Sequence, residues 1–284
     1  MTDRIAVLGA GQMGNGIAHV FALAGFPVVM IDVVNAALSK GRDTIAKNLD
    51  RQIAKGIVPA EQRPEILDRL STHTSLNAVT GASLIVEAAT EDRDLKFKIF
   101  AELDRLADAG TVLATNTSSI SITEIAARTA RPELVIGMHF MNPAPVMQLV
   151  EIIRGLATSD ATMQRVLAWS TALGKTPVEV NDYPGFVANR ILMPMINEAV
   201  FCLMEGVGSA ESIDTVMKLG MNHPMGPLAL ADLIGLDTCL SILEVLHGGL
   251  GDSKYRPCPL LRKYVAAGWL GRKSGRGFYT YPSS

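Results

Sequence analysis

The sequence predicts an α/β fold, in which a doubly wound, mostly parallel sheet is followed by an all-helical C-terminal domain. The chain opens with an apolar strand, Ile5–Leu8, that runs straight into a glycine-rich turn. Short apolar runs then alternate with helical patterns, which is typical of doubly wound sheets. The tripeptide Tyr183-Pro184-Gly185 ends this alternation, and helical patterns follow until the very end of the chain. We therefore expect two domains, residues 1–183 and residues 184–284.

The expected elements of the first domain begin with a βαβ unit. A second apolar run, Val28–Ile31, follows the helix after the glycine turn, and another helical stretch extends from about Val34 to Lys55. Polar sequence that reads as helix and loop then reaches about Leu76. Later apolar runs predict strands at Ser83–Ala88, Thr111–Thr115, Leu134–Phe140, Gln148–Ile153 and Thr176–Val180, with helical patterns at Leu95–Ala107 and Ile122–Arg128.

The second domain reads as a set of helices. Its apolar and small residues follow helical spacing in four stretches, and Gly235 marks a break within the third. Two interpretations of these apolar stretches remain open: an internal core, or a core together with a self-complementary dimer face. The four stretches are Phe186–Glu205, Ala210–Leu219, Leu228–His247 and Leu260–Ala267.

The glycine-rich turn has the order of a dinucleotide-binding βαβ unit. In Gly9-Ala-Gly11-Gln-Met-Gly14, Gly9 is expected to make the tight turn, Gly11 to admit a diphosphate, and Gly14 to allow close helix packing. Gln12 and Met13 belong to the same predicted cofactor-binding segment. Asp32, at the end of the second strand, is expected to bind the ribose hydroxyls and to repel a 2′-phosphate, which favours NAD. The alternative is a glycine-rich turn with a surface acid. The order of strand, glycines, helix, strand and acid favours a Rossmann-type domain.

Composition excludes several other classes of protein. Hydrophobic residues make up 48% of the chain and charged residues 19%, with a formal net charge of −2. We expect no nucleic-acid partner and no membrane association, because neither a basic surface nor a spanning segment is visible. Cys202, Cys239 and Cys258 are widely spaced and fit no metal site or disulfide framework. With no leader sequence recognisable before the first strand, a cytoplasmic location is expected.

A candidate acid/base pair lies near the end of the first domain. His139 closes one apolar run, and Glu151 lies in the next, after a proline-containing connection. If the two runs form an antiparallel hairpin centred on Pro145, His139 lies opposite Glu151 on one face. A carboxylate can fix the tautomer of an imidazole that takes a substrate proton. The alternative is a strand-end histidine with a structural role, but a carboxylate on an apolar face needs a partner.

A run of small polar residues follows the strand that ends at Thr115. Ligands of open α/β sheets bind beyond the carboxyl ends of the strands, so this run lies at the expected edge. Asn116 and Ser118 are candidates for substrate or cofactor contacts, whereas Ser119 or Ser121 is expected only to cap a helix. Ser121 and Glu124 have the spacing of a capping box.

Together these motifs resemble the L-3-hydroxyacyl-CoA dehydrogenase family over essentially the whole chain, and the chain is similar to its compact 3-hydroxybutyryl-CoA members. Beyond the glycine turn, the resemblance is carried by the segments Asn116–Ser119, His139–Met147, Leu149–Glu151, Pro184–Arg190, His223–Pro227 and Gly271–Phe278. Met141 follows His139-Phe140 where phenylalanine is more common.

The resemblance implies roles for particular residues. His139 matches the catalytic base and Glu151 the acid that orients it. Ser118 matches the serine that hydrogen-bonds the substrate oxygen, and Asn189 an asparagine that completes the site from the second domain. Asp92 stands where some relatives have asparagine, and no role is expected of it. Four further residues match positions that approach the cofactor or the CoA chain: Glu91, Lys96, Asn142 and Lys273.

A basic stripe is the candidate contact for the phosphates of CoA. Lys47, Arg51 and Lys55 recur every four residues along the expected helix after Asp32, so they share one face. The alternative is an ordinary solvated face. The family resemblance also favours a homodimer through the second domain.

The predicted function is an NAD-dependent interconversion of short-chain (S)-3-hydroxyacyl-CoA, such as 3-hydroxybutyryl-CoA, and 3-ketoacyl-CoA, such as acetoacetyl-CoA. Hydride transfer would be assisted by a His-Glu acid/base dyad, and the resemblance places the reaction in fatty-acid metabolism. One alternative is a dehydrogenase of the same fold that acts on a free hydroxy acid or sugar acid. Another is a non-catalytic NAD-binding protein of the crystallin type, although such a protein has no need of the dyad.

Overall fold

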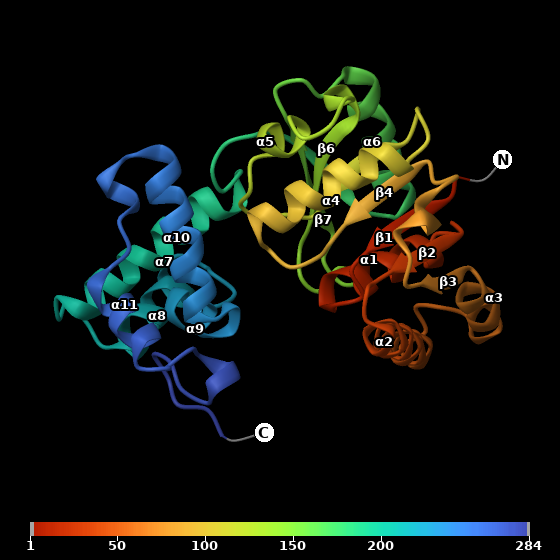
Figure 1. Ribbon diagram of the computed structural model, residues 1–284. Helices are drawn as coiled ribbons and strands as arrows, with labels where there is room; N and C mark the ends of the chain where they lie inside the picture. Colours follow the sequence, from red (N-terminus) through yellow and green to blue (C-terminus); the bar gives the residue numbers. More distant parts are fainter. Residues whose placement is uncertain (1–2, 283–284) are drawn as a thin grey trace. The chain divides into compact units, whose positions relative to one another are not determined.

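The structure of the chain is a computed structural model that describes residues 3–282 (Figure 1). The chain divides into two units, with the division between Asp182 and Tyr183. The first unit is a sheet flanked by helices, and the second is built from helices (Figure 1). The predicted fold class is therefore confirmed.

Eight strands form one sheet in the order β3-β2-β1-β4-β5-β6-β7-β8. Neighbouring strands are parallel except β6 and β7, which pair antiparallel. From β3 to β6 this is the strand order of a Rossmann fold, whose switch point lies between β1 and β4. The strands are β1 (Ile5–Leu8), β2 (Val28–Ile31), β3 (Leu70–His73), β4 (Leu84–Glu87), β5 (Val112–Thr115), β6 (Val135–Phe140), β7 (Leu149–Arg154) and β8 (Thr176–Asn181).

The helices of the first unit occupy the connections between strands. All the predicted strands are present, but β3 lies within sequence that we expected to be helix and loop. Only Leu70 of this strand is buried, so it carries no apolar pattern. The helices are α1 (Gln12–Leu23), α2 (Asn35–Ala54), α3 (Arg63–Asp68), α4 (Arg93–Leu106), α5 (Ile122–Ala126) and α6 (Asp160–Ala172), with short 3₁₀ helices at Ala60–Gln62, Leu76–Val79 and Pro132–Leu134.

Strand alternation sends neighbouring side chains to opposite faces of the sheet. On one face, Met138 and Val150 join a core that includes Ile17 of α1 and Val166 of α6. Gly137 faces the other side, where a Cβ would lie 2.9 Å from Ile122 Cδ1 of α5. Because side chains alternate along each strand, His139 and Glu151 lie on this second face as well.

Five α-helices make up most of the second unit. The third predicted stretch is broken at Gly235, as expected, with φ +104°. Among the described residues, strand-like pairing here is limited to isolated bridges near the C-terminal end, from Arg276 to Gly271 and Thr280. The helices are α7 (Ala188–Met204), α8 (Ala210–Thr215), which continues as a π-helix, η4 (Val216–Gly220), α9 (Pro227–Ile234), α10 (Leu236–Leu250) and α11 (Pro259–Ala266), with 3₁₀ helices η5 (Ser253–Tyr255) and η6 (Arg272–Ser274).

A buried carboxylate, Asp232 of α9, holds the closing segment of the chain. Its side chain is 1% exposed and accepts hydrogen bonds from the backbone amides of Phe278 and Tyr279, both at 3.0 Å. The hydroxyl of Tyr281 donates a third at 3.0 Å. A Cβ on Gly277 would lie 1.9 Å from Asp232 Oδ1, so packing requires glycine at this position of the Gly271–Phe278 segment.

A second buried carboxylate, Asp214 of α8, caps α9. It accepts hydrogen bonds from the amides of Leu228 and Ala229, both at 2.9 Å, and from the hydroxyl of Tyr279 at 2.8 Å. Burial and the bond to Asp214 raise the pKa of Tyr279. A Cβ on Gly226 would lie 2.2 Å from Asp214 Cγ. The Met-Gly-Pro motif before α9 therefore has a structural explanation.

Among residues 3–282, no helix combines the length and the apolar character that a bilayer crossing requires.

His19 is a fully buried titratable group on α1. Its Nε2 lies 3.0 Å from Gln52 Oε1 of α2, while Nδ1 has no hydrogen-bond partner among the described residues. Burial lowers the pKa of His19 to about 4, and the charge of Lys175 acts in the same direction. The unfolded chain binds a proton near the ordinary pKa of 6.5, whereas the folded chain binds it only near 4. The folded state therefore loses stability as the pH falls through this interval.

We expect His19→Gln to flatten the pH dependence of stability between pH 6.5 and 4. The protonation penalty in the parent chain amounts to about 3 kcal/mol at the lower end, at about 1.4 kcal/mol per unit of pKa shift. Denaturant unfolding at a series of pH values measures the difference in slope. His73→Gln, at an exposed position on β3, is the control and should keep the parental slope. Equal slopes for His19→Gln and the parent would contradict the prediction.

Candidate active site

The glycine turn joins β1 to α1 at the carboxyl edge of the sheet. Gly9 has φ +94°, and a Cβ there would lie 2.6 Å from Ala88 O. A Cβ on Gly14 would lie 1.8 Å from Gly9 O, so packing excludes any larger residue. A Cβ on Gly11 would meet no atom of the described chain within 4 Å. The turn is thus tight on its protein side and open at the N-terminus of α1, which suits the diphosphate of a dinucleotide.

Asp32 lies directly after β2 and beside this turn. Its Oδ2 accepts a hydrogen bond from the Ala10 amide at 2.8 Å, and its Oδ1 accepts one from the Val34 amide at 2.9 Å. These bonds fix the carboxylate next to the glycine turn, as the βαβ pattern predicts. The residues present therefore fit a dinucleotide whose ribose carries free hydroxyls.

Two asparagines make hydrogen bonds at the carboxyl edge of the sheet, one to the neighbouring strand and one to the start of α1. Asn116, after β5, accepts a hydrogen bond from the Phe140 amide at 2.9 Å. Asn142, after β6, accepts one from Gln12 Nε2 at 3.0 Å. Both residues therefore lie at the edge where ligands of open α/β sheets bind. A direct contact of either side chain with a ligand stays a prediction.

His139 and Glu151 form a buried pair across β6 and β7, the one antiparallel strand pair of the sheet within residues 3–282. They are directly opposite one another in the β6–β7 register, so the predicted hairpin register is confirmed. His139 Nδ1 lies 2.9 Å from Glu151 Oε2. The residues are 9% and 2% exposed. An acceptor on Nδ1 places the proton of a neutral imidazole there and directs the basic lone pair to Nε2. The pair has the geometry of an acid/base device.

Ser118 lies in a hydrogen-bonded turn organised by Glu91. Glu91 Oε1 accepts bonds from the Ser118 amide at 2.9 Å and its hydroxyl at 3.2 Å, from the Thr117 hydroxyl at 2.6 Å and from the Ser119 hydroxyl at 3.1 Å. Partial burial raises the pKa of Glu91, but Lys96 and these bonds lower it overall. Glu91 is therefore an ionised group that orders the turn. Ser119 bonds Glu91, while Ser121 caps α5 at the Glu124 amide.

Lys96 and Glu87 form a buried ion pair at the carboxyl end of β4. Lys96 Nζ lies 2.7 and 2.9 Å from the two oxygens of Glu87, and both side chains are at most 1% exposed. Thr115 donates to the same carboxylate at 2.7 Å, and Lys96 lies 3.5 Å from Glu91. Breaking such a pair leaves an uncompensated buried charge. In this structure Lys96 neutralises Glu87 at the end of β4, and its predicted cofactor contact remains a prediction.

A cavity of about 480 Å³ opens beside the glycine turn. Helix α2 contributes one wall, and the basic stripe follows it: Lys47 and Arg51 lie on α2, Lys55 is its C-cap, and all three are exposed. Arg51 donates to Asn48 at 3.2 Å, and Asn48 also lines the cavity, so the stripe continues to its rim. The other lining residues include Gly11, Gln12, Asn15, Lys40, Thr44 and the segment 142–145.

Two predicted site residues belong to the second unit. Asn189 is the second residue of α7. Lys273 lies in η6, and its Nζ is 2.6 Å from Asp237 Oδ1. That ion pair lies close to Gly235, where a Cβ would come within 3.0 Å of Lys273 Nζ.

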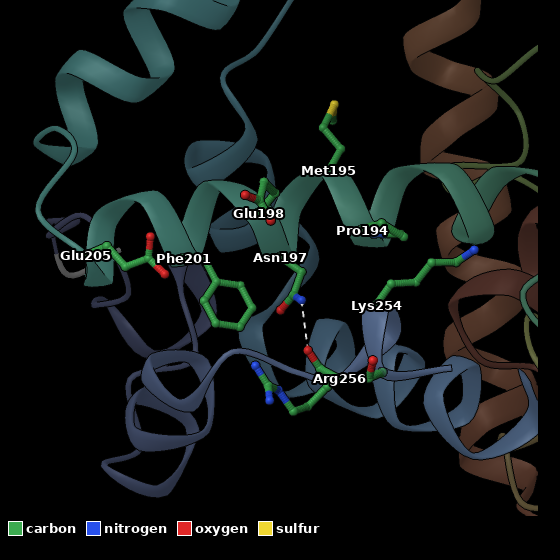
Figure 2. Close-up of a pocket in the computed structure, with 9 residues that line it drawn as sticks. Pro194, Met195, Asn197, Glu198, Phe201, Glu205, Lys254 and Arg256 are labelled. Carbon is green, nitrogen blue, oxygen red and sulfur yellow. Dashed lines mark hydrogen bonds between the residues drawn. The ribbon is translucent and has the colours of Figure 1, made fainter. Parts of the chain in front are cut away.

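A separate hollow of about 600 Å³ lies between α7 and η5 in the second unit (Figure 2). Asn197 lines this hollow and is held by two hydrogen bonds. Its Nδ2 donates to Arg256 O at 3.0 Å, and its Oδ1 accepts from the Cys258 amide at 2.8 Å. Glu198, Lys254 and Arg256 also line it. None of the residues predicted from the sequence lines this hollow.

Sequence reasoning missed two features of the site. Glu87 is the buried partner of Lys96, and the signal was a carboxylate at the end of the strongly apolar run of β4. Asp92, to which no role was assigned, is the N-cap of α4 and accepts from the Leu95 amide at 2.7 Å. An aspartate three residues before Leu95 at a helix start is a recognisable capping signal.

Within the described part of the chain, no group of three or more His, Cys, Asp or Glu side chains could hold a metal ion. Cys202, Cys239 and Cys258 are free thiols.

The fold and the site define a class of protein, the NAD-binding oxidoreductases with a Rossmann-type first domain. Two family models match the chain. The NAD-binding domain of 3-hydroxyacyl-CoA dehydrogenase matches residues 4–183, and the C-terminal domain of the same family matches residues 185–281. The chain belongs to the 3-hydroxyacyl-CoA dehydrogenase family. The resemblance inferred from its motifs, the NAD cofactor and the assignment as an NAD-dependent dehydrogenase are confirmed.

Individual relatives cover nearly the entire chain. A probable 3-hydroxybutyryl-CoA dehydrogenase of Bacillus subtilis is 60% identical over 98% of this chain and 97% of the relative. A 3-hydroxybutyryl-CoA dehydrogenase of Bradyrhizobium diazoefficiens is 56% identical over 98% of this chain and 95% of the relative. The crystal structure of (S)-3-hydroxybutyryl-CoA dehydrogenase from Ralstonia eutropha matches with a TM-score of 0.97 at 52% identity, over 100% of both chains.

Proposed function

We propose that this enzyme interconverts (S)-3-hydroxybutyryl-CoA and acetoacetyl-CoA, with His139 and Glu151 as its acid/base dyad. The observation that carries the proposal is the buried 2.9 Å contact between these two side chains at the carboxyl edge of the sheet. The names of relatives with 56–60% identity over the whole chain support the choice of substrate.

The proposed mechanism assigns proton transfer to His139. In the oxidative direction its Nε2 takes the proton of the 3-hydroxyl, while Glu151 stabilises the imidazolium that forms. NAD bound at the glycine turn supplies the acceptor for the hydride from C3. In the reductive direction, protonated His139 and the hydroxyl of Ser118, rotated from Glu91 toward the substrate, donate to the developing alkoxide oxygen, while the Ser118 amide keeps its bond to Glu91. Glu91 would hold the Ser118 turn in place for this contact.

The proposed cofactor residues divide by their part in binding. Gly9, Gly11 and Gly14 shape the diphosphate site, together with Gln12 and Met13, and Asp32 would accept bonds from the adenosine ribose. Asn116, Asn142, Glu91, Lys96 and Lys273 remain predicted cofactor or CoA residues, and Asn189 a predicted substrate residue. We propose residues 1–183 as the NAD-binding domain and residues 184–284 as the substrate and dimerisation domain.

The experiment that tests the reaction follows NADH absorbance with two oxidants. Acetoacetyl-CoA should oxidise NADH rapidly, whereas acetoacetate at the same concentration should not, because it lacks the CoA phosphates that the basic stripe is proposed to bind. Equal rates with the two would favour a dehydrogenase of free hydroxy acids. No turnover with either, despite NADH binding, would favour a non-catalytic binding protein.

We expect the variant Lys47→Gln, Arg51→Gln, Lys55→Gln to raise the KM for acetoacetyl-CoA and to leave kcat unchanged. Three exposed charge contacts of about 0.5 kcal/mol each would change affinity by roughly tenfold. The effect should shrink as ionic strength rises, because salt screens exposed charges beyond about 10 Å at 0.1 M. Steady-state kinetics at several salt concentrations measures both effects.

The control for this variant neutralises three exposed cations on other helices, Lys98 and Arg105 of α4 and Lys263 of α11. It makes the same change in net charge and should leave the KM for acetoacetyl-CoA unaltered. A KM at low salt equal to that of the parent enzyme would instead identify the stripe as an ordinary solvated face.

A homodimer through the helical domain is also part of the proposal. Large apolar side chains remain exposed on this unit, among them Ile191 at 68%, Val207 at 73% and Leu219 at 81%. Exposed apolar surface of this kind marks interaction sites. Light scattering should give twice the chain mass of 30.3 kDa. A mass of one chain at all concentrations would argue against the dimer.

A further inference from the structure

Lys175 bridges two points of the connection between β6 and β7. Its Nζ donates to Ala144 O at 2.7 Å and to Met147 O, also at 2.7 Å. Two carbonyl acceptors offset the cost of partly burying the ammonium group. This one side chain therefore links Ala144 to Met147 within the connection.

The connection needs such a restraint on its second half. Ala144 is 2% exposed and packs on α1, where a Cβ on Gly16 would lie 3.2 Å from Ala144 Cβ. Val146 and Met147 are 68% and 40% exposed. The amides of both bond Pro143 O at 3.0 Å, which makes a local turn but does not join it to the sheet. Lys175 links the anchored half to the exposed half.

Lys175 is itself held firmly by the sheet. It directly precedes β8, and the amide of Thr176 donates to Gln148 O at 2.8 Å, just before β7 begins. The next pairs in register join Leu149 to Thr176 and Glu151 to Val178. The ammonium group is therefore held in a fixed position beside the strand that carries Glu151.

We propose that Lys175 is a positioning residue for the reaction, one that fixes the β6–β7 connection so that His139 and Glu151 keep their register. The inference rests on the proposed function of that pair. Lys175 acts through the connection and not by contact with the reacting atoms. A displacement of about 1 Å in a catalytic group can lower the rate on the order of 100-fold, so the restraint matters to turnover more than to binding.

The test replaces Lys175 by methionine, which keeps the apolar stem and removes the ammonium group. We expect kcat for acetoacetyl-CoA reduction to fall on the order of 10- to 100-fold. The KM for acetoacetyl-CoA and the Kd for NADH should change by less than about threefold, which is within about 0.7 kcal/mol. Lys175→Arg, which retains the charge and several N–H donors, should restore part of kcat. The kcat of Lys175→Gln, which has a shorter neutral donor, should lie between those of Lys175→Met and Lys175→Arg.

Lys98→Met is the matched control, because Lys98 is exposed on α4, and it should retain parental kinetics. A kcat for Lys175→Met within twofold of the parent enzyme would overturn the inference. A loss of kcat that Lys175→Arg does not recover even in part would also overturn it. The same holds for a loss of kcat that matches the unfolded fraction measured by thermal denaturation. An inactive parent enzyme would overturn the proposed function and this inference together, whereas an active parent with an unaffected variant overturns the inference alone.

Discussion

His139→Gln is expected to abolish turnover of acetoacetyl-CoA while leaving the Kd for NADH nearly unchanged. A positioned general base contributes about 10²- to 10⁴-fold in rate, and a glutamine amide can neither take nor release the proton. The amide can still donate to Glu151, so the buried carboxylate keeps a partner and the hairpin should fold. The residues proposed to hold the dinucleotide diphosphate lie on the β1–α1 turn, which the substitution does not touch.

Steady-state NADH oxidation measures the loss of kcat, and NADH fluorescence titration measures the retained affinity. His73→Gln, at the exposed end of β3, serves as the matched control and should behave like the parent enzyme. A His139→Gln enzyme that keeps more than about a tenth of parental kcat would show that another group moves the proton, since the expected loss is at least about 100-fold.

Gly14→Ala is expected to damage both folding and NADH binding. The added methyl group would lie 1.8 Å from Gly9 O, far inside van der Waals contact, and the atom it meets is backbone that cannot swing away. The turn would have to move, and overpacking of this kind costs about 1–3 kcal/mol or more. Because the same turn presents the open N-terminus of α1, we expect the Kd for NADH to rise at least about tenfold, equivalent to about 1.4 kcal/mol.

Denaturant unfolding and NADH titration check the two effects separately. Gly110→Ala is the control, because a Cβ there meets nothing within 4 Å and its φ is not in the left-handed region. It should change the free energy of unfolding by less than about 0.5 kcal/mol. Parental stability and parental NADH affinity in Gly14→Ala would show that the turn relaxes freely, contrary to the packing described.

Much of the site could be predicted because its signals are local. The glycine turn, Asp32 and the β6–β7 register each follow from short segments in which residue type and spacing fix the geometry. The strand β3 could not be predicted in this way, since three of its four residues are exposed and its place depends on pairing with β2.

The contacts that stayed hidden join distant parts of the chain. Lys175 reaches carbonyl groups 28 and 31 residues away, and backbone acceptors leave no mark in the sequence. The pairing of Lys96 with Glu87 spans only nine residues, but it depends on how α4 packs against the end of β4. Asp214 and Asp232 bind the closing segment through Tyr279 and Phe278, which lie 65 and 46 residues away in the sequence.

The antiparallel junction has an evolutionary consequence. His139 and Glu151 are only 12 positions apart in the sequence, so a short loop closure brings the two proposed proton-transfer groups together without help from the helical unit. If that unit selects the acyl chain, as we propose, substitutions there can change specificity and leave this pair of side chains in place. One ancestral hairpin can in this way be inherited unchanged by enzymes of diverging specificity.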